Sequence, residues 1–235
     1  MKKNVLPLLI LLILGSCASE KDGDTMYING NIKGLKKGKL YLQHLRDTLL
    51  VTLDSLELKG DGNFSFSTPL ESPEVFYLYL DKKDNNDIND RLTFFGERGT
   101  IDIRTDWNRF VANAEISGSK TQDKWEEYQR TMSNLNKRGM EIMVQSNQTE
   151  VPLTEKEMDS LEMLSIRNMQ KGYAFAINFA LANRDNHIAP YIALKEIPDA
   201  NRKYLDSIAT SLSPEVARSK YGQELQTYLN QKEED

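Results

Sequence analysis

The first half of the chain alternates between hydrophobic and polar residues with a period of two, which is typical of half-buried β-strands. The alternation runs from Met26 to about Ile116 and is interrupted by short turn segments. Asp61-Gly62 and Gly99 mark two of these turns, because glycine adopts positive φ without strain. The expected strands cover residues 26–32, 40–45, 49–58, 64–67, 74–80, 91–95 and 100–105, with a basic turn at 33–39. Many short strands of this kind predict an antiparallel β-sandwich or barrel-like module.

Beyond Ser117 the hydrophobic residues recur every three or four positions, which is the period of an amphipathic helix. Ser119 or Thr121 is the expected N-cap of the first helix. Its apolar stripe comprises Trp125, Tyr128, Met132, Leu135 and Ile142. A second long helix is expected from Glu155 onward, and its apolar segment 173–182 should be buried on most sides.

Three shorter helices are expected in the remainder of the chain. Asn186 opens the first, and Asp199 is the expected cap of the second. Ser213-Pro214 begins the third, because serine is a good N-cap and proline is tolerated at the first helical position. The buried face of this last helix comprises Val216, Tyr221, Leu225 and Leu229. The whole pattern predicts an α+β fold, with an antiparallel β domain at 26–116 and a helical region at 117–235.

The N-terminal segment has neither of these patterns. Two lysines at positions 2 and 3 precede an apolar run at 5–14, which is too short to span a bilayer because spanning needs about 20 residues. The sequence LGSC at 14–17 follows and resembles the lipobox of bacterial lipoprotein signals. The resemblance implies cleavage between Ser16 and Cys17 and diacylglyceryl modification of the Cys17 thiol. An ordinary signal peptide with an incidental cysteine is the alternative.

On the lipobox interpretation, residues 1–16 are a signal peptide and residues 17–25 are a lipidated, polar tether. A membrane is then the first expected partner, and the expected location is the cell envelope, at the outer membrane. Acidic residues soon after Cys17 resemble a surface-export signal of some Bacteroidota, so both the periplasmic and the surface face stay open. Cys17 is the only cysteine, and the mature chain therefore has no dithiol chemistry.

The composition limits the kinds of partner. Hydrophobic residues make up 39% and charged residues 28% of the chain, which predicts a globular protein rather than a disordered one. The formal net charge is -5. We expect no nucleic-acid partner, because phosphate binding needs clustered lysine and arginine.

The two histidines are the residues best suited to acid–base or metal chemistry, but they are isolated from each other. His44 lies near the end of an expected strand, and His187 lies near the start of a helix. Two separate histidines cannot complete a zinc site, and the sequence has no Gly-x-Ser-x-Gly elbow and no P-loop. We interpret both as surface or capping residues, and we expect no cofactor, no catalytic residue and no enzymatic activity.

Segment 81–91, DKKDNNDINDR, is the best candidate for a cation site, because calcium prefers carboxylate and amide oxygens. The candidate ligands are Asp84, Asp87 and Asp90. The segment lacks the glycine at the sixth place and the glutamate at the twelfth place of an EF-hand loop. A solvated hairpin loop is therefore the default interpretation.

A recurring triplet of Asp, then Ser or Thr, then an apolar residue resembles the O-glycosylation sequon of Bacteroidota envelope proteins. The candidate acceptors are Thr25, Thr48, Ser55, Ser160 and Ser207. Asp-Ser pairs also serve in turns and caps, so the triplet has an ordinary structural interpretation as well.

The chain after the leader resembles a domain of unknown function, with its helical region, that precedes the thioredoxin-like domain of Bacteroidota thiol–disulfide oxidoreductases. The segments that carry the resemblance are, in order, GKLYLQHL, LDSLELKGDGNFSFS, PEVFYLYL, FFGERGTIDI, AEISGSKTQDKWEEY and LSPEVARSKYGQELQTYL. In such relatives a Cys-x-x-Cys pair carries the chemistry, and this sequence has none. We expect a stand-alone lipoprotein without the thioredoxin domain, so the resemblance implies fold and compartment and transfers no catalytic residue.

These observations favour a lipid-anchored cell-envelope protein with a non-catalytic binding domain. One alternative is an accessory subunit that works in trans with a thioredoxin-like oxidoreductase, which would be its protein partner. A hydrolase that uses paired carboxylates is the third function considered, and it would need two acids facing each other in a deep cleft.

Overall fold

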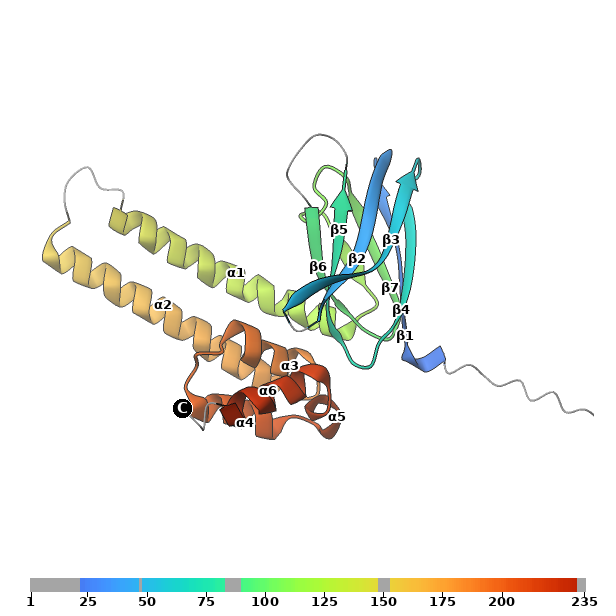
Figure 1. The fold of residues 1–235 in the computed structure, drawn as a ribbon. Helices are drawn as coiled ribbons and strands as arrows, with labels where there is room; N and C mark the ends of the chain where they lie inside the picture. The colour runs from blue at the N-terminus through green and yellow to red at the C-terminus, as the bar shows by residue number, and fades with distance from the viewer. Residues whose placement is uncertain (1–21, 47, 83–89, 148–152, 232–235) are drawn as a thin grey trace, which may run out of the picture.

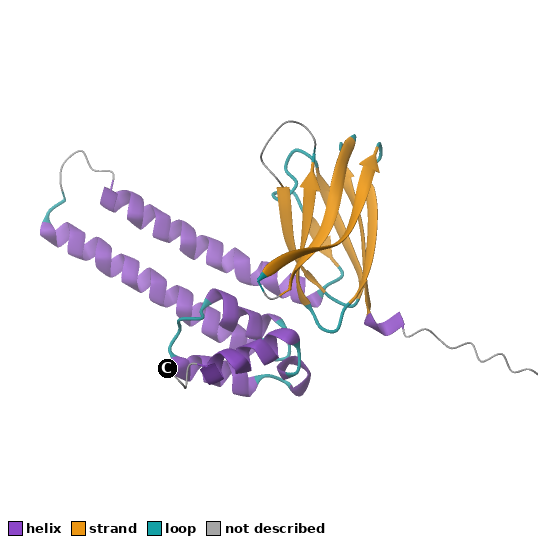
Figure 2. Cartoon of the chain, in the orientation of Figure 1, coloured by secondary structure: helices purple, strands orange, loops and turns teal. Residues whose placement is uncertain are grey.

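The computed structural model describes residues 22–46, 48–82, 90–147 and 153–231 (Figure 1). Within these residues, two four-stranded sheets precede a helical region, which confirms the predicted α+β fold (Figure 2). The strands are β1 Thr25–Lys33, β2 Lys37–Arg46, β3 Leu49–Lys59, β4 Asn63–Pro69, β5 Glu74–Asp81, β6 Asp90–Gly96, β7 Gly99–Asp106 and β8 Glu115–Ser117. The expected signal peptide at 1–16 lies outside the described residues.

The two sheets have the strand orders β4-β1-β7-β8 and β3-β2-β5-β6. Every pairing is antiparallel except that of β1 with β7, which is parallel. The expectation of a purely antiparallel module is therefore wrong at this pair. The physical reason is that the chain passes through the whole second sheet between β1 and β7, and this long crossover returns it in the same direction.

The sandwich core follows from the period-two pattern. Met26, Ile28 and Ile32 of β1 are fully buried, and they pack with inward residues of the facing sheet such as Leu40 and Leu42. Between them, Gly30 lies so close to its neighbours that an added Cβ would be 2.3 Å from the carbonyl oxygen of Ile103. Glycine is required there by this close approach and not by a turn.

The predicted turns are mostly confirmed. Gly62 and Gly99 have φ values of 71° and 103°, in the left-handed region that glycine favours. The basic turn expected at 33–39 is shorter, because β2 already begins at Lys37. The three-residue strand β8 was not expected, since it is too short to show a period.

Within the described residues, the helical region begins with two long helices that form an antiparallel hairpin. Figure 1 shows this hairpin projecting from the body, away from the side on which the N-terminal chain enters. The helical elements are α1 Lys120–Asn147, α2 Glu155–Ala182, α3 Ile188–Tyr191, the π-helical turn η2 Ile192–Glu196, α4 Arg202–Ser211, α5 Pro214–Ala217 and α6 Lys220–Gln231. No helix in the described part of the chain is both long enough and apolar enough to span a bilayer.

The helix caps agree only in part with expectation. The Ser119 hydroxyl accepts from the backbone N–H of Gln122 at 3.0 Å, so Ser119 rather than Thr121 caps α1. Ser213 caps α5 as predicted. The Asp199 prediction is wrong, because Asn201 caps α4 and Asp199 instead accepts a hydrogen bond from the Tyr173 hydroxyl.

Two expectations about the helices need correction. The last helix is divided, since α5 ends at Ala217 and α6 begins at Lys220, although its four predicted apolar residues are all buried. Segment 173–182 is buried on one side only, because Ala174 and Asn178 are exposed. The neighbouring short helices cover one face of α2 and leave the opposite face to solvent.

A second hydrophobic core joins the helical region to one end of the sandwich. Val75 of β5 and Phe95 of β6 belong to this core, together with Trp125, Tyr191 and Tyr221 of the helices. The rings of Phe95 and Tyr191 meet edge to face, with centroids 4.9 Å apart, a favourable geometry for aromatic pairs. The sandwich end and the helices therefore share one packed interior.

Candidate functional site

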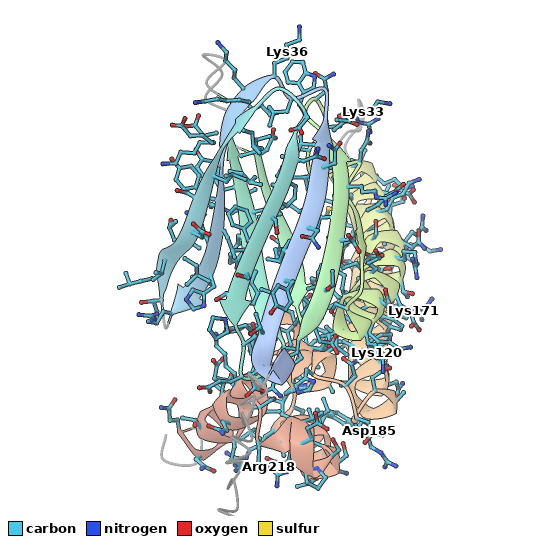
Figure 3. All side chains as sticks on the ribbon, turned by 90° about the vertical axis from the view of Figure 1, so that its right-hand side faces the viewer. Lys33, Lys36, Lys120, Lys171, Asp185 and Arg218 are labelled. Atoms are coloured by element: carbon cyan, nitrogen blue, oxygen red, sulfur yellow. The ribbon has the colours of Figure 1, made fainter. Side chains whose placement is uncertain are left out.

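A cavity of about 660 Å³ lies between the end of the sandwich and the short helices. Its lining comes from the β4–β5 loop, the β6–β7 turn, the start of α3, and α5 and α6. The lining residues are Pro69, Leu70, Glu71, Ser72, Pro73, Glu74, Glu97, Arg98, His187, Glu215, Arg218, Ser219, Lys220 and Gln223. Figure 3 shows Arg218 at the helical end of the molecule, with Lys33 and Lys36 at the far end of the sandwich.

Arg98 holds the rim of this cavity in place. Its guanidinium donates hydrogen bonds to the carbonyl oxygens of Leu70 at 2.9 Å and Glu71 at 2.6 Å. It also pairs with Asp24 at 3.2 Å, directly before β1. Arg98 thus links the β4–β5 loop to Asp24 at the start of β1, and these contacts give Arg98 a structural role.

Glu74 and Lys220 form an ion pair along one wall, and His44 lies beside it. The Lys220 ammonium pairs with the Glu74 carboxylate, which links α6 to the start of β5. His44 of β2 lies behind them, with Nδ1 4.0 Å from Glu74. Burial lowers the pKa of His44, although the nearby Glu74 opposes this shift. The imidazole therefore favours its neutral form in the folded protein.

His187 lies in the cavity wall at the start of α3. Burial lowers its pKa, Glu215 and Glu97 oppose that shift, and Arg98 adds to it. Within the described residues, no group of three His, Cys, Asp or Glu side chains is arranged to hold a metal ion. Neither histidine is thus brought into a ligand set by the residues around it.

Two of the cavity carboxylates are already engaged by protein groups. Glu74 is neutralised by Lys220, and Glu97 accepts hydrogen bonds from the Ser119 hydroxyl at 3.0 Å and the Thr121 N–H at 3.1 Å. Glu97 thereby complements the positive N-terminal end of α1.

Charges of both signs stay available to a ligand in this cavity. Among the described residues, no ion pair engages Glu71, Glu215 or Arg218, and all three are exposed. This arrangement suits electrostatic recognition of a ligand that itself carries both charges.

None of the other predicted site residues that the structure describes lines this cavity. Cys17, Ser16, Asp84 and Asp87 lie outside the described residues, and Asp90 begins β6 in an ion pair with Lys82.

Four of the five glycosylation candidates lie on the surface. Thr48, Ser55, Ser160 and Ser207 are exposed, and Thr25 is half-buried in β1. The structure does not bring any of these residues together into one site.

His44 lies near the end of β2 and His187 at the start of α3, as expected, but the sequence did not predict that both lie beside a cavity. His187 occupies the N-cap position of α3, although its side chain makes no capping hydrogen bond, and it lines the cavity. His44 lies beside Glu74 of the cavity wall. No sequence spacing could have revealed this, because the docking of the helices on the sandwich end brings the two residues near one cavity.

Comparison with known proteins gives a family for the first part of the fold. Residues 26–125 match the family described as "Domain of unknown function (DUF4369)". No curated protein matches the chain. The match includes the sandwich from Met26 onward and ends at Trp125 in α1, whose ring packs against Phe95 of β6. Residues 26–125 are therefore a DUF4369 domain.

Proposed function

We propose that this protein is a lipid-anchored component of the cell envelope whose folded part is a non-catalytic binding domain. The observation that carries the proposal is the leader, in which two lysines, an apolar run and the sequence LGSC follow in order. Acyl chains on Cys17 would anchor the protein stably, because each buried methylene contributes about 0.8 kcal/mol and two or more chains suffice.

The position of the chain entry supports a membrane-proximal cavity. β1 begins at Thr25, and Asp24 directly before it contacts Arg98 on the rim of the cavity. A tether of residues 17–24 reaches at most about 28 Å, since an extended chain spans about 3.5 Å per residue. Lipidated Cys17 would therefore hold the cavity end of the sandwich close to the membrane surface.

The lining of the cavity supports a small polar ligand with both charges, such as an amino acid or a short peptide. Its volume lies in the range of small-molecule sites, about 300–1,000 Å³. Thermal unfolding in the presence of a panel of free amino acids and dipeptides tests this assignment. A rise in melting temperature that Arg218→Glu abolishes supports it, and the absence of any rise across the panel contradicts it.

Membrane fractionation of the native host tests the anchor. Wild-type protein should sediment with membranes, and Cys17→Ala should lose this association because no thiol accepts the lipid. Ser19→Ala, two residues further on, is the matched control and should behave as wild type. Equal membrane association of Cys17→Ala and wild type would contradict lipid anchoring.

A second function is suggested by the ordered resemblance of this sequence to regions that precede thioredoxin-like domains. The protein would then serve as an accessory subunit to a separate Cys-x-x-Cys protein. Co-purification of such a protein with the native chain supports this role, and its consistent absence from the purified complex counts against it.

A carboxylate-based hydrolase receives less support from the cavity. Glu74 and Glu97 are both engaged by neighbouring groups. The two unpaired carboxylates of the cavity, Glu71 and Glu215, are exposed, whereas a glycosidase-type mechanism needs two carboxyl groups that flank the bond to be cleaved.

A further inference from the structure

One face of the α1–α2 hairpin carries an open groove lined with methionine. Six of the eight methionines of the chain lie between residues 132 and 169. The groove has a volume of about 460 Å³ and lies between the two helices. It shares no lining residue with the cavity at the end of the sandwich. Its apolar lining includes Met132, Leu135, Met140, Met169 and Ile197.

Helical spacing extends this lining towards the tip of the hairpin. Met132, Asn136, Met140 and Met143 recur every three or four residues on α1, so they share one flank of that helix. The corresponding flank of α2 comprises Glu155, Met158, Glu162, Ser165 and Met169. Members of both flanks line the groove, so the two flanks form one continuous face.

The methionines on this face are unusually exposed for apolar side chains. Met140 is 64% exposed, Met143 57%, Met158 54% and Met169 56%. Exposed apolar side chains also occur on other flanks of the hairpin, as at Val144 and Met163, but four methionines gather on this face, and a group of exposed apolar side chains is typical of an interaction site. Methionine is suited to such a site, because its flexible, polarisable side chain adapts to different partners.

Two glycines leave the groove without side chains at their positions. Gly139 of α1 and Gly172 of α2 line it, and each lies within a long helix, where glycine costs about 1 kcal/mol relative to alanine. The Asn168 amide, which also lines the groove, donates to the carbonyl oxygen of Leu135 at 3.0 Å and links the two helices. The hairpin thus retains two unfavourable residues at the positions where side chains would fill the groove.

The methionine face of the hairpin carries carboxylates but no basic residue, whereas the other flanks carry charges of both signs, as in the pair of Arg138 with Glu141. Glu155 and Glu162 lie on the methionine flank of α2, and Glu196 lines the base of the groove. Of the described residues that line the groove, none is a lysine or an arginine. The basic residues of the hairpin fall on the other flanks by helical spacing, namely Lys120, Lys124, Arg130, Lys137, Arg138, Lys156, Arg167 and Lys171.

We propose that this groove binds a basic amphipathic helix of a partner protein. The methionines would receive the apolar face of the helix, and the carboxylates of Glu155, Glu162 and Glu196 would pair with its lysines or arginines. Helix-in-groove binding of this kind is a recurrent mode of peptide recognition. Residues 158–173 span roughly 22 Å at 1.5 Å per residue, which matches a bound helix of about 15 residues.

This inference rests on the proposed binding role of the protein but is independent of its lipid anchor. The test therefore uses the full-length protein in a neutral detergent, so a failure of lipidation would leave the result unchanged. The probe is a fluorescent 15-residue peptide of leucine and lysine with helical spacing. The comparison peptide keeps every leucine and replaces each lysine by glutamate.

The basic peptide should bind at least about tenfold more tightly than the acidic one, and its affinity should fall as salt screens the carboxylates. The double variant Met140→Ser, Met169→Ser should bind it about tenfold more weakly, since both apolar anchors are lost. These side chains are exposed, so the variant should fold normally. The matched control is Met163→Ser on the opposite flank, which should bind as wild type.

Charge reversal provides a second, independent arm. Glu162→Lys should weaken binding of the basic peptide, whereas Arg167→Glu on the other flank should leave it unchanged or slightly stronger. Equal affinity for the two peptides, or equal effects of groove and control variants, would overturn the proposal. Self-association that is lost in the methionine double variant would also overturn it, because a second copy would then occupy the groove.

Discussion

His44 lies at the junction of sheet and helices, where its ring stacks on Phe76 with centroids 5.9 Å apart. Neither ring nitrogen has a hydrogen-bond partner among the described residues. The charged groups around it are Glu74, Lys220 and Arg46. A buried polar group without a hydrogen-bond partner lowers the free energy of unfolding, so we expect His44 to destabilise the contact between sheet and helices.

The variant His44→Phe should raise the free energy of unfolding at pH 7 by about 1 kcal/mol, because it keeps the aromatic shape and removes two unpaired nitrogens. The pH dependence follows from the lowered pKa of His44. Below the ordinary value of 6.5, the unfolded chain binds a proton that the folded protein resists, so stability falls as the pH drops. Urea titrations at pH 7.5 and 5.5 measure both effects.

Between those two pH values the loss of stability should be smaller in His44→Phe than in wild type. Because ordinary carboxyl groups titrate near pH 4, they contribute little in this window. An identical loss in both proteins would show that His44 does not titrate as its surroundings indicate.

Residue roles could be predicted from the sequence only where they are local. Ser213 was predicted as a cap and Ser119 as one of two candidates, because a cap depends on residues within one helical turn. The prediction that Asp199 caps α4 was wrong, because Asn201 caps this helix instead. Asp199 accepts a hydrogen bond from Tyr173 of another helix, which the local sequence does not show. The position of the two histidines beside a cavity was not predictable for the same reason, since the residues around them come from distant segments.

At the scale of elements, the α1–α2 hairpin was predictable from its apolar stripe, and its groove was not. Trp125, Tyr128 and Ile142 are buried as the spacing predicted. The groove depends on which flank of each helix stays uncovered once the short helices have packed against α2. A single sequence does not show which flank of each helix stays uncovered.

Two glycine substitutions separate helix propensity from close packing. Gly139→Ala should raise the free energy of unfolding by about 0.8–1 kcal/mol, because its Cβ would meet only Asn168 Nδ2, at 3.4 Å. Gly222→Ala in α6 should destabilise the protein despite the same propensity gain. Its Cβ would lie 2.2 Å from the carbonyl oxygen of Val216. Thermal unfolding of both variants checks the opposite signs, and a common sign would show that the packing around Gly222 is looser than described.

At the scale of the whole molecule, the shared core between sandwich and helices determines how the protein should unfold. The Val75 N–H donates a hydrogen bond to the buried Tyr221 hydroxyl at 3.1 Å, which links β5 to α6. The periodicity of the sequence predicted both parts but not this docking, and it did not predict the parallel β1–β7 pair. Both depend on contacts between segments far apart in the chain.

Tyr221→Phe should lower the free energy of unfolding by about 1–3 kcal/mol, because the buried Val75 N–H loses its acceptor. Since the two parts share a core, tryptophan fluorescence and far-UV circular dichroism should still report one transition, displaced equally. Tyr204→Phe is the control, since Tyr204 is 48% exposed and its loss should change stability by less than about 0.5 kcal/mol. Two separate transitions in wild type would show that the sandwich and helices unfold independently.

The central claim is that the folded binding domain is held at a membrane through Cys17, and the intact mass of the native protein tests it most directly. Protein purified from its own envelope should have a mass equal to that of a polypeptide beginning at Cys17 plus a diacylglyceryl group, with or without a further acyl chain. A chain that retains residues 1–16, or that begins elsewhere and carries no lipid, would contradict the account.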